Sequence, residues 1–289
     1  MEKSVKIGIV ITVYNEETLI AETVKSIFDY FSNDVDFSLF DWDFTVIVVD
    51  DASTDSTPSM LYYLPKQHVG MKVITHYKNL GVGAAIATGY KEALKQDCDI
   101  AVVMAGDGQM SCYDLLPIVS PVVKKQADYV KGCRYMNNSI TKVPVMRYMG
   151  GVILTYLTSL TSRYNFWDIF DSQCGYTAIS RTALEAIDLN NIYPGYGCPN
   201  DIIMKCAQAG LKIKNVPIEA VYRKGEKSGI KIKKVIFTIP YILMKGWFKT
   251  IISMDFTLKK YRELLRTIKE ERIPIYLMKE YFEKLSHTT

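Results

Sequence analysis

Three clusters of acidic, amide and aromatic hydroxyl side chains are the residues of this sequence best suited to chemistry: Tyr14-Asn15-Glu16, Asp50-Asp51 and Asp107-Gly108-Gln109. Such groups hold a divalent cation or accept hydrogen bonds from a sugar or a base. Asp107 and Gln109 carry oxygen ligands two residues apart, which suits Mg²⁺ or Mn²⁺. A cation held there would bridge the phosphates of a nucleotide diphosphate. The alternative is that Asp107 only caps the next helix.

Each cluster follows a stretch that the residue pattern predicts to be a buried strand. Four strands are predicted from runs of β-branched residues, at Val5–Val13, Phe44–Val49, Met71–Thr75 and Ile100–Met104. Helical spacing lies between them at Glu16–Phe31 and Gly83–Leu94. This alternation predicts an α/β fold with one mostly parallel sheet flanked by helices. Ligands bind beyond the carboxyl ends of such strands, which is where the three clusters fall.

The second half of the sequence has a less regular pattern. Its predicted elements are a helix at Tyr148–Ser162, a strand at Gln173–Ser180, a helix at Asp201–Gln208, a bent strand or strand pair at Lys212–Tyr222, and amphipathic helices from Ile230 onward. We therefore expect two parts, a catalytic domain over residues 1–229 and a C-terminal amphipathic region over residues 230–289.

Composition narrows the class of protein. The 289 residues carry a formal net charge of +4, which is too weak to indicate nucleic acid as a partner. The six cysteines form no C-x-x-C pair, so reduced, buried thiols of a cytosolic chain are expected. The sequence also shows no signal peptide and no uninterrupted apolar run of about 20 residues, the length of a membrane span.

Four motifs, each after a predicted strand, resemble those of family 2 glycosyltransferases, which have the GT-A fold. They are Thr12-Val13-Tyr14-Asn15-Glu16, the segment from Val49 to Thr57 that begins Val-Asp-Asp, Asn79-Leu80-Gly81-Val82-Gly83-Ala84-Ala85, and Ala105-Gly106-Asp107-Gly108-Gln109. Later segments resemble the dolichyl-phosphate mannose synthase-like branch, whose members transfer sugars to polyprenyl phosphates. They are Lys131-Gly132-Cys133-Arg134-Tyr135, the segment from Asp171 to Thr177, and the segment from Val216 to Ser228.

The resemblance implies a role for each matched residue. Nucleotide binding would fall to Val13, Tyr14, Glu16, Asp51, Gly106 and Asp107, and cation binding to Asp107 and Gln109. The acceptor phosphate would be bound by Arg134, Arg147, Arg223 and Ser228, a role that suits arginine because its contacts to phosphate are bidentate and permanently charged. One departure matters, because Ala105 stands where the family has the first Asp of its D-x-D motif.

The family implies inversion at the anomeric carbon, with two classes of acceptor left open. A polyprenyl phosphate is already anionic and needs little help from a base, so positioning and charge would do most of the work. A sugar hydroxyl needs a general base, for which Asp201 is the first candidate and Asp171 the second. A third possibility, suggested by Ala105, is a non-catalytic protein that binds nucleotide sugars.

The segment from Arg223 to Lys260 predicts contact with a membrane surface. It carries ten Lys and Arg residues against Glu226 and Asp255, interleaved with apolar residues that include Trp247. Basic residues beside an apolar face are typical of a helix that lies in the bilayer interface. We therefore expect a peripheral protein on the cytoplasmic face of a membrane, with packing on the domain or on a second copy as the alternatives.

Overall fold

The computed structural model describes residues 4–34, 42–219, 221 and 237–250. The chain divides into two compact units, Met1–Trp247 and Phe248–Thr289. The seven-stranded sheet and the helices that cover it belong to the first unit. The predicted boundary between residues 229 and 230 lies outside the described residues, as do Arg223 and Ser228.

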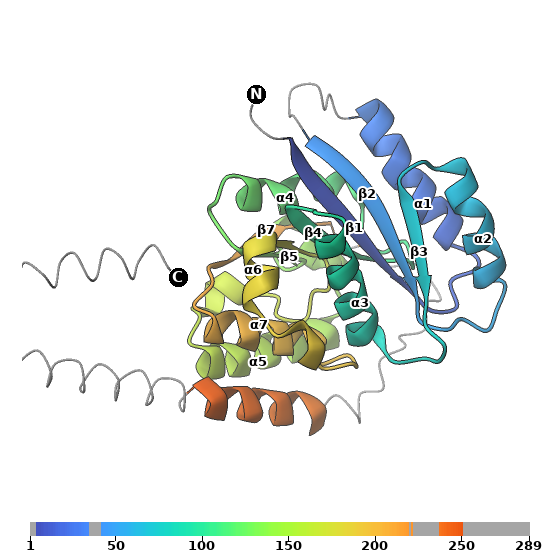
Figure 1. Ribbon diagram of the computed structural model, residues 1–289. Helices are drawn as coiled ribbons and strands as arrows, with labels where there is room; N and C mark the ends of the chain where they lie inside the picture. The colour runs from blue at the N-terminus through green and yellow to red at the C-terminus, as the bar shows by residue number, and fades with distance from the viewer. Residues whose placement is uncertain (1–3, 35–41, 220, 222–236, 251–289) are drawn as a thin grey trace, which may run out of the picture. The chain divides into compact units, whose positions relative to one another are not determined.

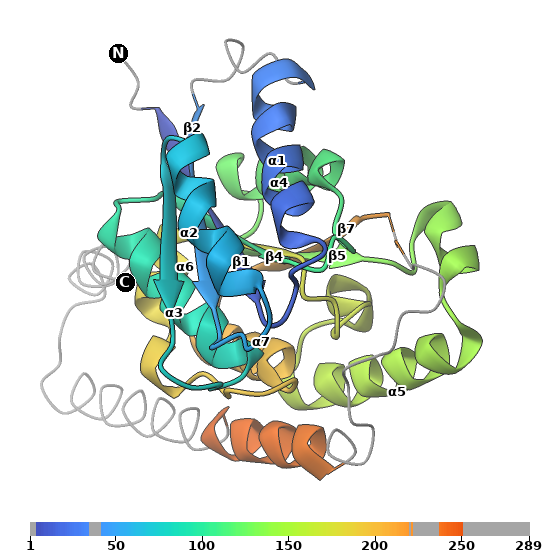
Figure 2. The ribbon, with the colours of Figure 1, turned by 90° about the vertical axis from the view of Figure 1, so that its right-hand side faces the viewer.

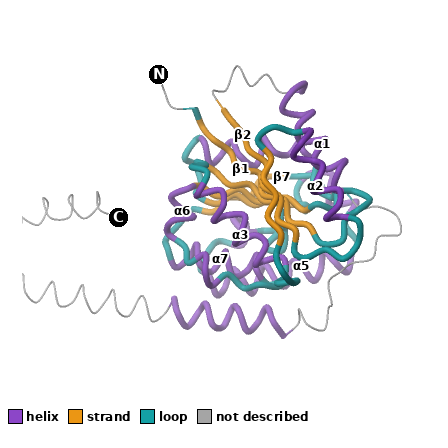
Figure 3. The backbone as a smooth tube through the Cα atoms, turned by 45° about the vertical axis from the view of Figure 1, so that its right-hand side comes forward, coloured by secondary structure: helices purple, strands orange, loops and turns teal. Residues whose placement is uncertain are grey.

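One seven-stranded sheet runs through this unit (Figures 1 and 3). In order of pairing its strands are β3 (Met71–Thr75), β2 (Trp42–Asp50), β1 (Val5–Val13), β4 (Ile100–Ala105), β6 (Thr177–Ser180), β5 (Tyr129–Cys133) and β7 (Ile213–Pro217). All neighbours pair in parallel except β6, which is antiparallel to both β4 and β5. The predicted α/β fold with a mostly parallel sheet is therefore confirmed.

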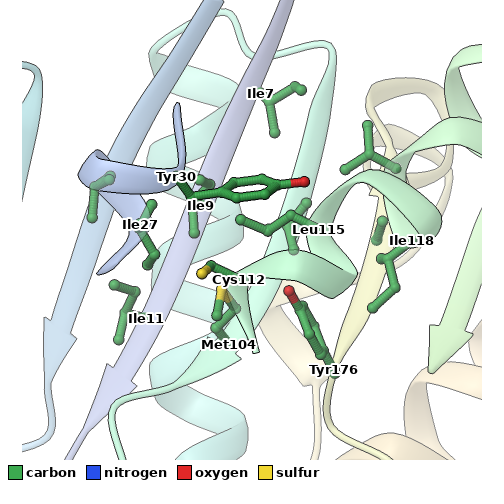
Figure 4. Close-up of a cluster of buried hydrophobic side chains, with 14 of the residues drawn as sticks. Ile7, Ile9, Ile11, Ile27, Tyr30, Met104, Cys112, Leu115, Ile118 and Tyr176 are labelled. Carbon is green, nitrogen blue, oxygen red and sulfur yellow. The ribbon is translucent and has the colours of Figure 1, made fainter. Parts of the chain in front are cut away.

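The sheet is covered on both faces, which explains the nearly continuous apolar runs of its central strands. Alternate residues of β1 point to opposite faces, so Ile7, Ile9 and Ile11 lie together on one side and Val10 lies on the other. Figure 4 shows the three isoleucines beside Met104 of β4, in the same buried cluster.

Two sets of helices enclose these faces. The first face packs against α1 (Ile20–Asp29), α2 (Thr57–Gln67) and α4 (Leu115–Val123), and the second against α3 (Val82–Lys95), α6 (Arg181–Ala186) and α7 (Cys198–Gln208). Small residues let α3 approach the sheet closely, since a Cβ on Gly89 would lie 2.1 Å from Cγ1 of Val10. All six cysteines are buried and free, as expected from their spacing.

Helix α5 (Val145–Ser162) and the helical residues 237–247 run side by side (Figure 2). Leu154 and Leu157 of α5 pack against Ile239 and Leu243, and Met204 of α7 completes the cluster. Among the helices of the described residues, none is long and apolar enough to cross a membrane.

Two predicted elements begin later than expected, for local reasons. Helix α1 starts at Ile20 rather than Glu16, after a turn in which the N–H groups of Leu19 and Ile20 both donate to the carbonyl oxygen of Glu16. The N–H groups of Glu16 and Glu17 donate to the side chains of Thr57 and Asp55, which ties this turn to the start of α2. Strand β6 starts at Thr177 rather than Gln173, because the chain turns at Asp171–Cys174, where the N–H of Cys174 donates to the carbonyl oxygen of Asp171.

Candidate active site

The carboxyl ends of β1, β2 and β4 meet at one edge of the sheet and are bonded to one another. The N–H of Asp51 donates to the carbonyl oxygen of Val13 over 2.9 Å, and the N–H of Gly106 donates to that of Thr12 over 3.0 Å. Thr12 is also the register partner of Ala105. The three predicted polar clusters therefore lie at a single edge. We call it the donor edge (residues 13–16, 50–55, 76 and 105–109), because the family resemblance assigns the nucleotide-sugar donor to it.

Side chains join the loops that follow β1 and β2. The N–H of Asn15 donates to Oγ of Ser53 (2.9 Å), and Oδ1 of Asn15 accepts from the N–H of Thr54 (2.7 Å). The N–H of Glu16 donates to Oγ1 of Thr57 (2.9 Å). Asn15 has a left-handed backbone with φ of 57°, which asparagine tolerates better than most residues. These bonds hold the first two motifs in a common conformation.

Three other residues of this edge differ in backbone conformation and in exposure. Ala52 has φ of 63°, in the left-handed region that favours glycine. Tyr14 is 45% exposed, so its ring presents a surface on which a base can stack. Asp50 is fully buried: its Oδ1 accepts from the N–H and hydroxyl of Ser53, while its Oδ2 has no protein partner among the described residues.

The carboxylate of Asp51 is held from three directions. Its Oδ1 lies 2.7 Å from Nδ1 of His76 and accepts from the N–H of Leu80 over 2.8 Å. Its Oδ2 accepts from the N–H of Gly81 over 2.7 Å. Nε2 of His76 lies 2.9 Å from Oγ1 of Thr88 in α3. Sequence reasoning missed His76, although it follows β3 just as the three predicted clusters follow their strands.

Asp107 and Gln109 lie in a tight turn after β4. The N–H of Gln109 donates to Oδ1 of Asp107 over 3.0 Å, and Gly108 has a left-handed φ of 67°. Gly106 is buried, and a Cβ on it would lie 2.9 Å from Cγ2 of Val13, so the main chain here packs tightly on β1. The described residues contain no cluster of three or more metal-binding His, Cys, Asp or Glu side chains. One carboxylate and one amide nevertheless fit Mg²⁺, which is commonly bound by one or two carboxylates together with substrate phosphates.

The residues predicted to bind the acceptor belong to a second region, which we call the acceptor half (residues 131–134, α5 and residues 170–175). Arg134 makes a bidentate pair with Asp171, with Nε 2.7 Å from Oδ2 and Nη2 2.9 Å from Oδ1. Asp171 is fully buried, whereas the side chain of Arg134 is 21% exposed. Burial lowers the pKa of Arg134, but the charge and hydrogen bonds of Asp171 outweigh it and raise that pKa well above its usual value.

A buried cation adjoins this pair. Lys131 is fully buried, and its Nζ donates to the carbonyl oxygen of Cys174 over 2.8 Å. Burial lowers the pKa of Lys131, while Cys174 and Asp171 oppose that effect. The sequence contained Lys131 within a matched motif, but nothing in its spacing indicated that it is buried. Arg147 lies half-buried in the first turn of α5.

A polar network connects α5, residues 172–173 and α7. The hydroxyl of Thr155 bonds to Oγ of Ser172 (3.1 Å), which accepts from Nε2 of Gln173 (3.0 Å). Gln173 also donates to Oδ1 of Asn200 (2.9 Å), whose Nδ2 donates to Oγ1 of Thr158 (2.7 Å). The network is buried at Thr155, Thr158, Ser172 and Asn200, so it holds α5 and residues 172–173 in place against α7.

Asp201, the candidate base, lies in the first turn of α7. Its Oδ2 accepts from the N–H of Tyr193 over 2.9 Å and lies 3.5 Å from Nζ of Lys205. These bonds give Asp201 a role in holding the loop before α7. Asp171, the second candidate, is engaged by Arg134. The catalytic roles of both residues remain predictions.

Comparison with known proteins decides the family. The profile described as "Glycosyl transferase family 2" matches residues 8–188. The chain belongs to glycosyl transferase family 2. Among its relatives, a UDP-N-acetylglucosamine–dolichyl-phosphate N-acetylglucosaminyltransferase of Methanococcus voltae is 28% identical and covers 75% of this chain and 86% of its own. An undecaprenyl-phosphate mannosyltransferase of Micrococcus luteus is 30% identical, and the match covers 62% of this chain and 72% of that protein.

Solved structures show the same fold at low identity. Mannosyl-3-phosphoglycerate synthase of Rubrobacter xylanophilus superposes with a TM-score of 0.57 at 16% identity, over 93% of this chain and 76% of its own. A structure of S. aureus TarS with UDP has a TM-score of 0.54 at 18% identity, and this chain spans only 65% of its length. The family 2 glycosyltransferase described here therefore has the GT-A fold that its motifs imply.

Proposed function

We propose that this glycosyltransferase moves a sugar, with inversion, from a nucleotide diphosphate sugar to a polyprenyl phosphate at a membrane surface. Two relatives are named for transfer to dolichyl phosphate and undecaprenyl phosphate. The donor edge supplies carboxylate, amide and aromatic groups of the kinds that a nucleotide diphosphate and its cation require. Arg134 follows β5, which the antiparallel β6 separates from β4. Since β6 is antiparallel to both strands, β5 runs in the same direction as β4 and ends at the same edge of the sheet.

One observation carries the choice of a lipid acceptor, namely the exposed apolar face of α5. Its exposed apolar residues recur at helical spacing along the whole helix: Val145, Met146, Met149, Ile153, Tyr156 and Leu160. They are 53–80% exposed, and the charged residue of this helix is Arg147 in its first turn. A long apolar face that begins at a basic residue matches a lipid that carries a phosphate head group.

The neighbouring helical residues 237–247 extend this surface. Ile239, Ile242 and Leu243 are buried, whereas Phe237, Tyr241 and Met244 are more than half exposed and Trp247 is 40% exposed. Aromatic residues of this kind favour the boundary between the lipid head groups and the acyl chains. We therefore place this helix pair at the cytoplasmic surface of a membrane, as the basic segment from Arg223 to Lys260 predicts.

The proposed reaction needs positioning more than proton transfer. A phosphate acceptor is anionic at neutral pH, so its oxygen can attack the anomeric carbon directly on the side opposite the departing nucleotide diphosphate. Arg134, held in one orientation by Asp171, and Arg147 would bind that phosphate. Asp107 and Gln109 would hold the divalent cation, Mg²⁺ or Mn²⁺, which supplies positive charge to the leaving diphosphate.

The test is a transfer assay with the full-length protein, a radiolabelled UDP- or GDP-sugar and Mn²⁺. Transfer that depends on added polyprenyl phosphate, with the label in the lipid fraction, is the expected result. Label that enters only an added oligosaccharide would replace the lipid by a sugar hydroxyl as acceptor and would return Asp201 to the role of base. Nucleotide binding without transfer to either acceptor would indicate a binding protein and overturn the proposal.

A further inference from the structure

The hydrogen bonds of Asp51 limit which base its carboxylate can recognise. Each carboxylate oxygen has two acceptor positions. Oδ1 uses both of them, for His76 and for the N–H of Leu80, while Oδ2 uses one for the N–H of Gly81. Within the described part of the chain, one acceptor position therefore remains on this carboxylate, and it is on Oδ2.

The imidazole of His76 is what closes Oδ1. A carboxylate only accepts hydrogen bonds, so Nδ1 of His76 must carry the proton that lies between them. Nε2 then bonds to the hydroxyl of Thr88. A hydroxyl can donate to a neutral ring or accept from a doubly protonated one, so Thr88 is a suitable partner for both forms of His76. The side chains of His76 and Asp51 are only 9% and 5% exposed, so water competes little for this bond. Thr88 lies within α3, which fixes the ring from the helix side.

Bases differ in how many donors they present to such a carboxylate. The Watson–Crick edge of guanine offers two adjacent N–H donors, which a carboxylate binds through both of its oxygens. Uracil offers a single N–H donor between two carbonyl oxygens, and one remaining acceptor position matches it. A guanine placed here would leave one of its donors without a partner, which is costly in a desolvated site.

We infer that the donor is a uridine diphosphate sugar, and that His76 is a positioning residue that sets this preference by occupying Oδ1 of Asp51. This inference rests on the proposed function and on the role that the family resemblance implies for Asp51, which is contact with the base of the nucleotide. His76 does not touch the reacting atoms, so its substitution changes donor affinity rather than the rate of the chemical step.

The experiment is calorimetric titration of the full-length protein with UDP and with GDP in the presence of Mn²⁺. The wild type is expected to bind UDP at least about tenfold more tightly than GDP, the factor for about one lost hydrogen bond. His76→Leu is expected to bring that ratio below about threefold, because it frees Oδ1. His76→Asn, whose amide can donate in place of Nδ1, should retain the preference.

A matched control and a second variant separate positioning from folding. His68→Leu makes the same exchange at the C-terminal end of α2, before β3 begins, whereas His76 follows the end of β3. It should leave the ratio of UDP to GDP affinity unchanged. Thr88→Val should lower the ratio by a smaller factor. Thermal unfolding of each variant shows whether it is folded. In a transfer assay, His76→Leu should raise KM for the donor while kcat changes little.

The outcomes distinguish the inference from the function beneath it. Tighter binding of GDP than of UDP would overturn the choice of base and leave the transferase intact. A preference for UDP that persists in folded His76→Leu would overturn the role of His76. If neither nucleotide binds, the proposed function itself fails.

Discussion

The donor edge and the acceptor half are held in place by different means. At the donor edge, loops that follow neighbouring parallel strands are joined by bonds between backbone N–H groups and the side chains of Asn15, Ser53 and Asp51. The acceptor half depends instead on a buried ion pair, Arg134–Asp171, and on a polar network between helices. The donor-edge contacts join segments that parallel strand pairing already brings together, whereas the acceptor-half contacts join a strand end, a turn and two helices that no strand pairing brings together.

The largest expected effect is the loss of stability that follows from breaking the buried ion pair Arg134–Asp171 in the acceptor half. Asp171→Asn leaves Arg134 without its counter-charge and is expected to lower the free energy of unfolding by about 3–5 kcal/mol, as measured by urea denaturation. Asp97→Asn is the matched control, because Asp97 is 80% exposed in its pair with Arg181, and it should change little. A loss below about 1 kcal/mol in Asp171→Asn would contradict the account of this half.

The apolar face of α5 provides the second comparison. Ile153→Asp and Tyr156→Asp, at positions 58% and 62% exposed, should each weaken binding to anionic lipid vesicles about tenfold without loss of fold. Vesicle co-sedimentation measures this effect. Val69→Asp, at a position 97% exposed before β3, controls for an added charge and should bind as the wild type does. Equal binding by all four proteins would remove α5 from the membrane contact.

Two adjacent glycines of α5 test how tightly the acceptor half is packed. A Cβ on Gly151 would lie 2.0 Å from Oη of the buried Tyr135, so Gly151→Ala should cost about 1–3 kcal/mol of unfolding free energy. Gly150 has nothing within 4 Å of that position, so Gly150→Ala should instead stabilise the helix by about 0.5–1 kcal/mol. Stabilisation of both variants, measured by denaturation, would mean that Tyr135 moves aside easily.

The smallest effect is expected at Ala52 of the donor edge. Ala52→Gly relieves the left-handed strain of about 1 kcal/mol but makes the unfolded chain more flexible, so the two terms nearly cancel. Both the melting temperature and the affinity for nucleotide should stay close to those of the wild type. A marked fall in affinity would show that the methyl group of Ala52 contributes to the donor edge.

These differences explain how far the sequence could be interpreted. Strands such as Val5–Val13 are buried on both faces, so their β-branched runs predict them directly, and parallel pairing brings the motifs that follow them to one edge. The antiparallel orientation of β6 could not be predicted, because a run of four residues has the same apolar pattern whichever way the strand runs.

The pairing of Arg134 with Asp171 was also hidden in the sequence. Arg134 was predicted to bind the acceptor phosphate and Asp171 was the second candidate base, but the two are 37 positions apart and no periodicity links them. His76 carried a weaker signal, a single titratable residue after β3, and its value became clear only from its contacts with Asp51 and Thr88. Burial of Lys131 likewise depends on the packing of the segment around Cys174.

The central claim is that side chains from separate strand ends gather around one cation-bound diphosphate, and Asp107 tests it most directly. Calorimetry of UDP binding with and without Mn²⁺ should show a large gain in affinity from the metal in the wild type. Asp107→Asn should lose most of that gain, because the carboxylate that holds the cation is gone. If the variant retains the full metal-dependent gain, Asp107 does not hold the cation and the arrangement described here is contradicted.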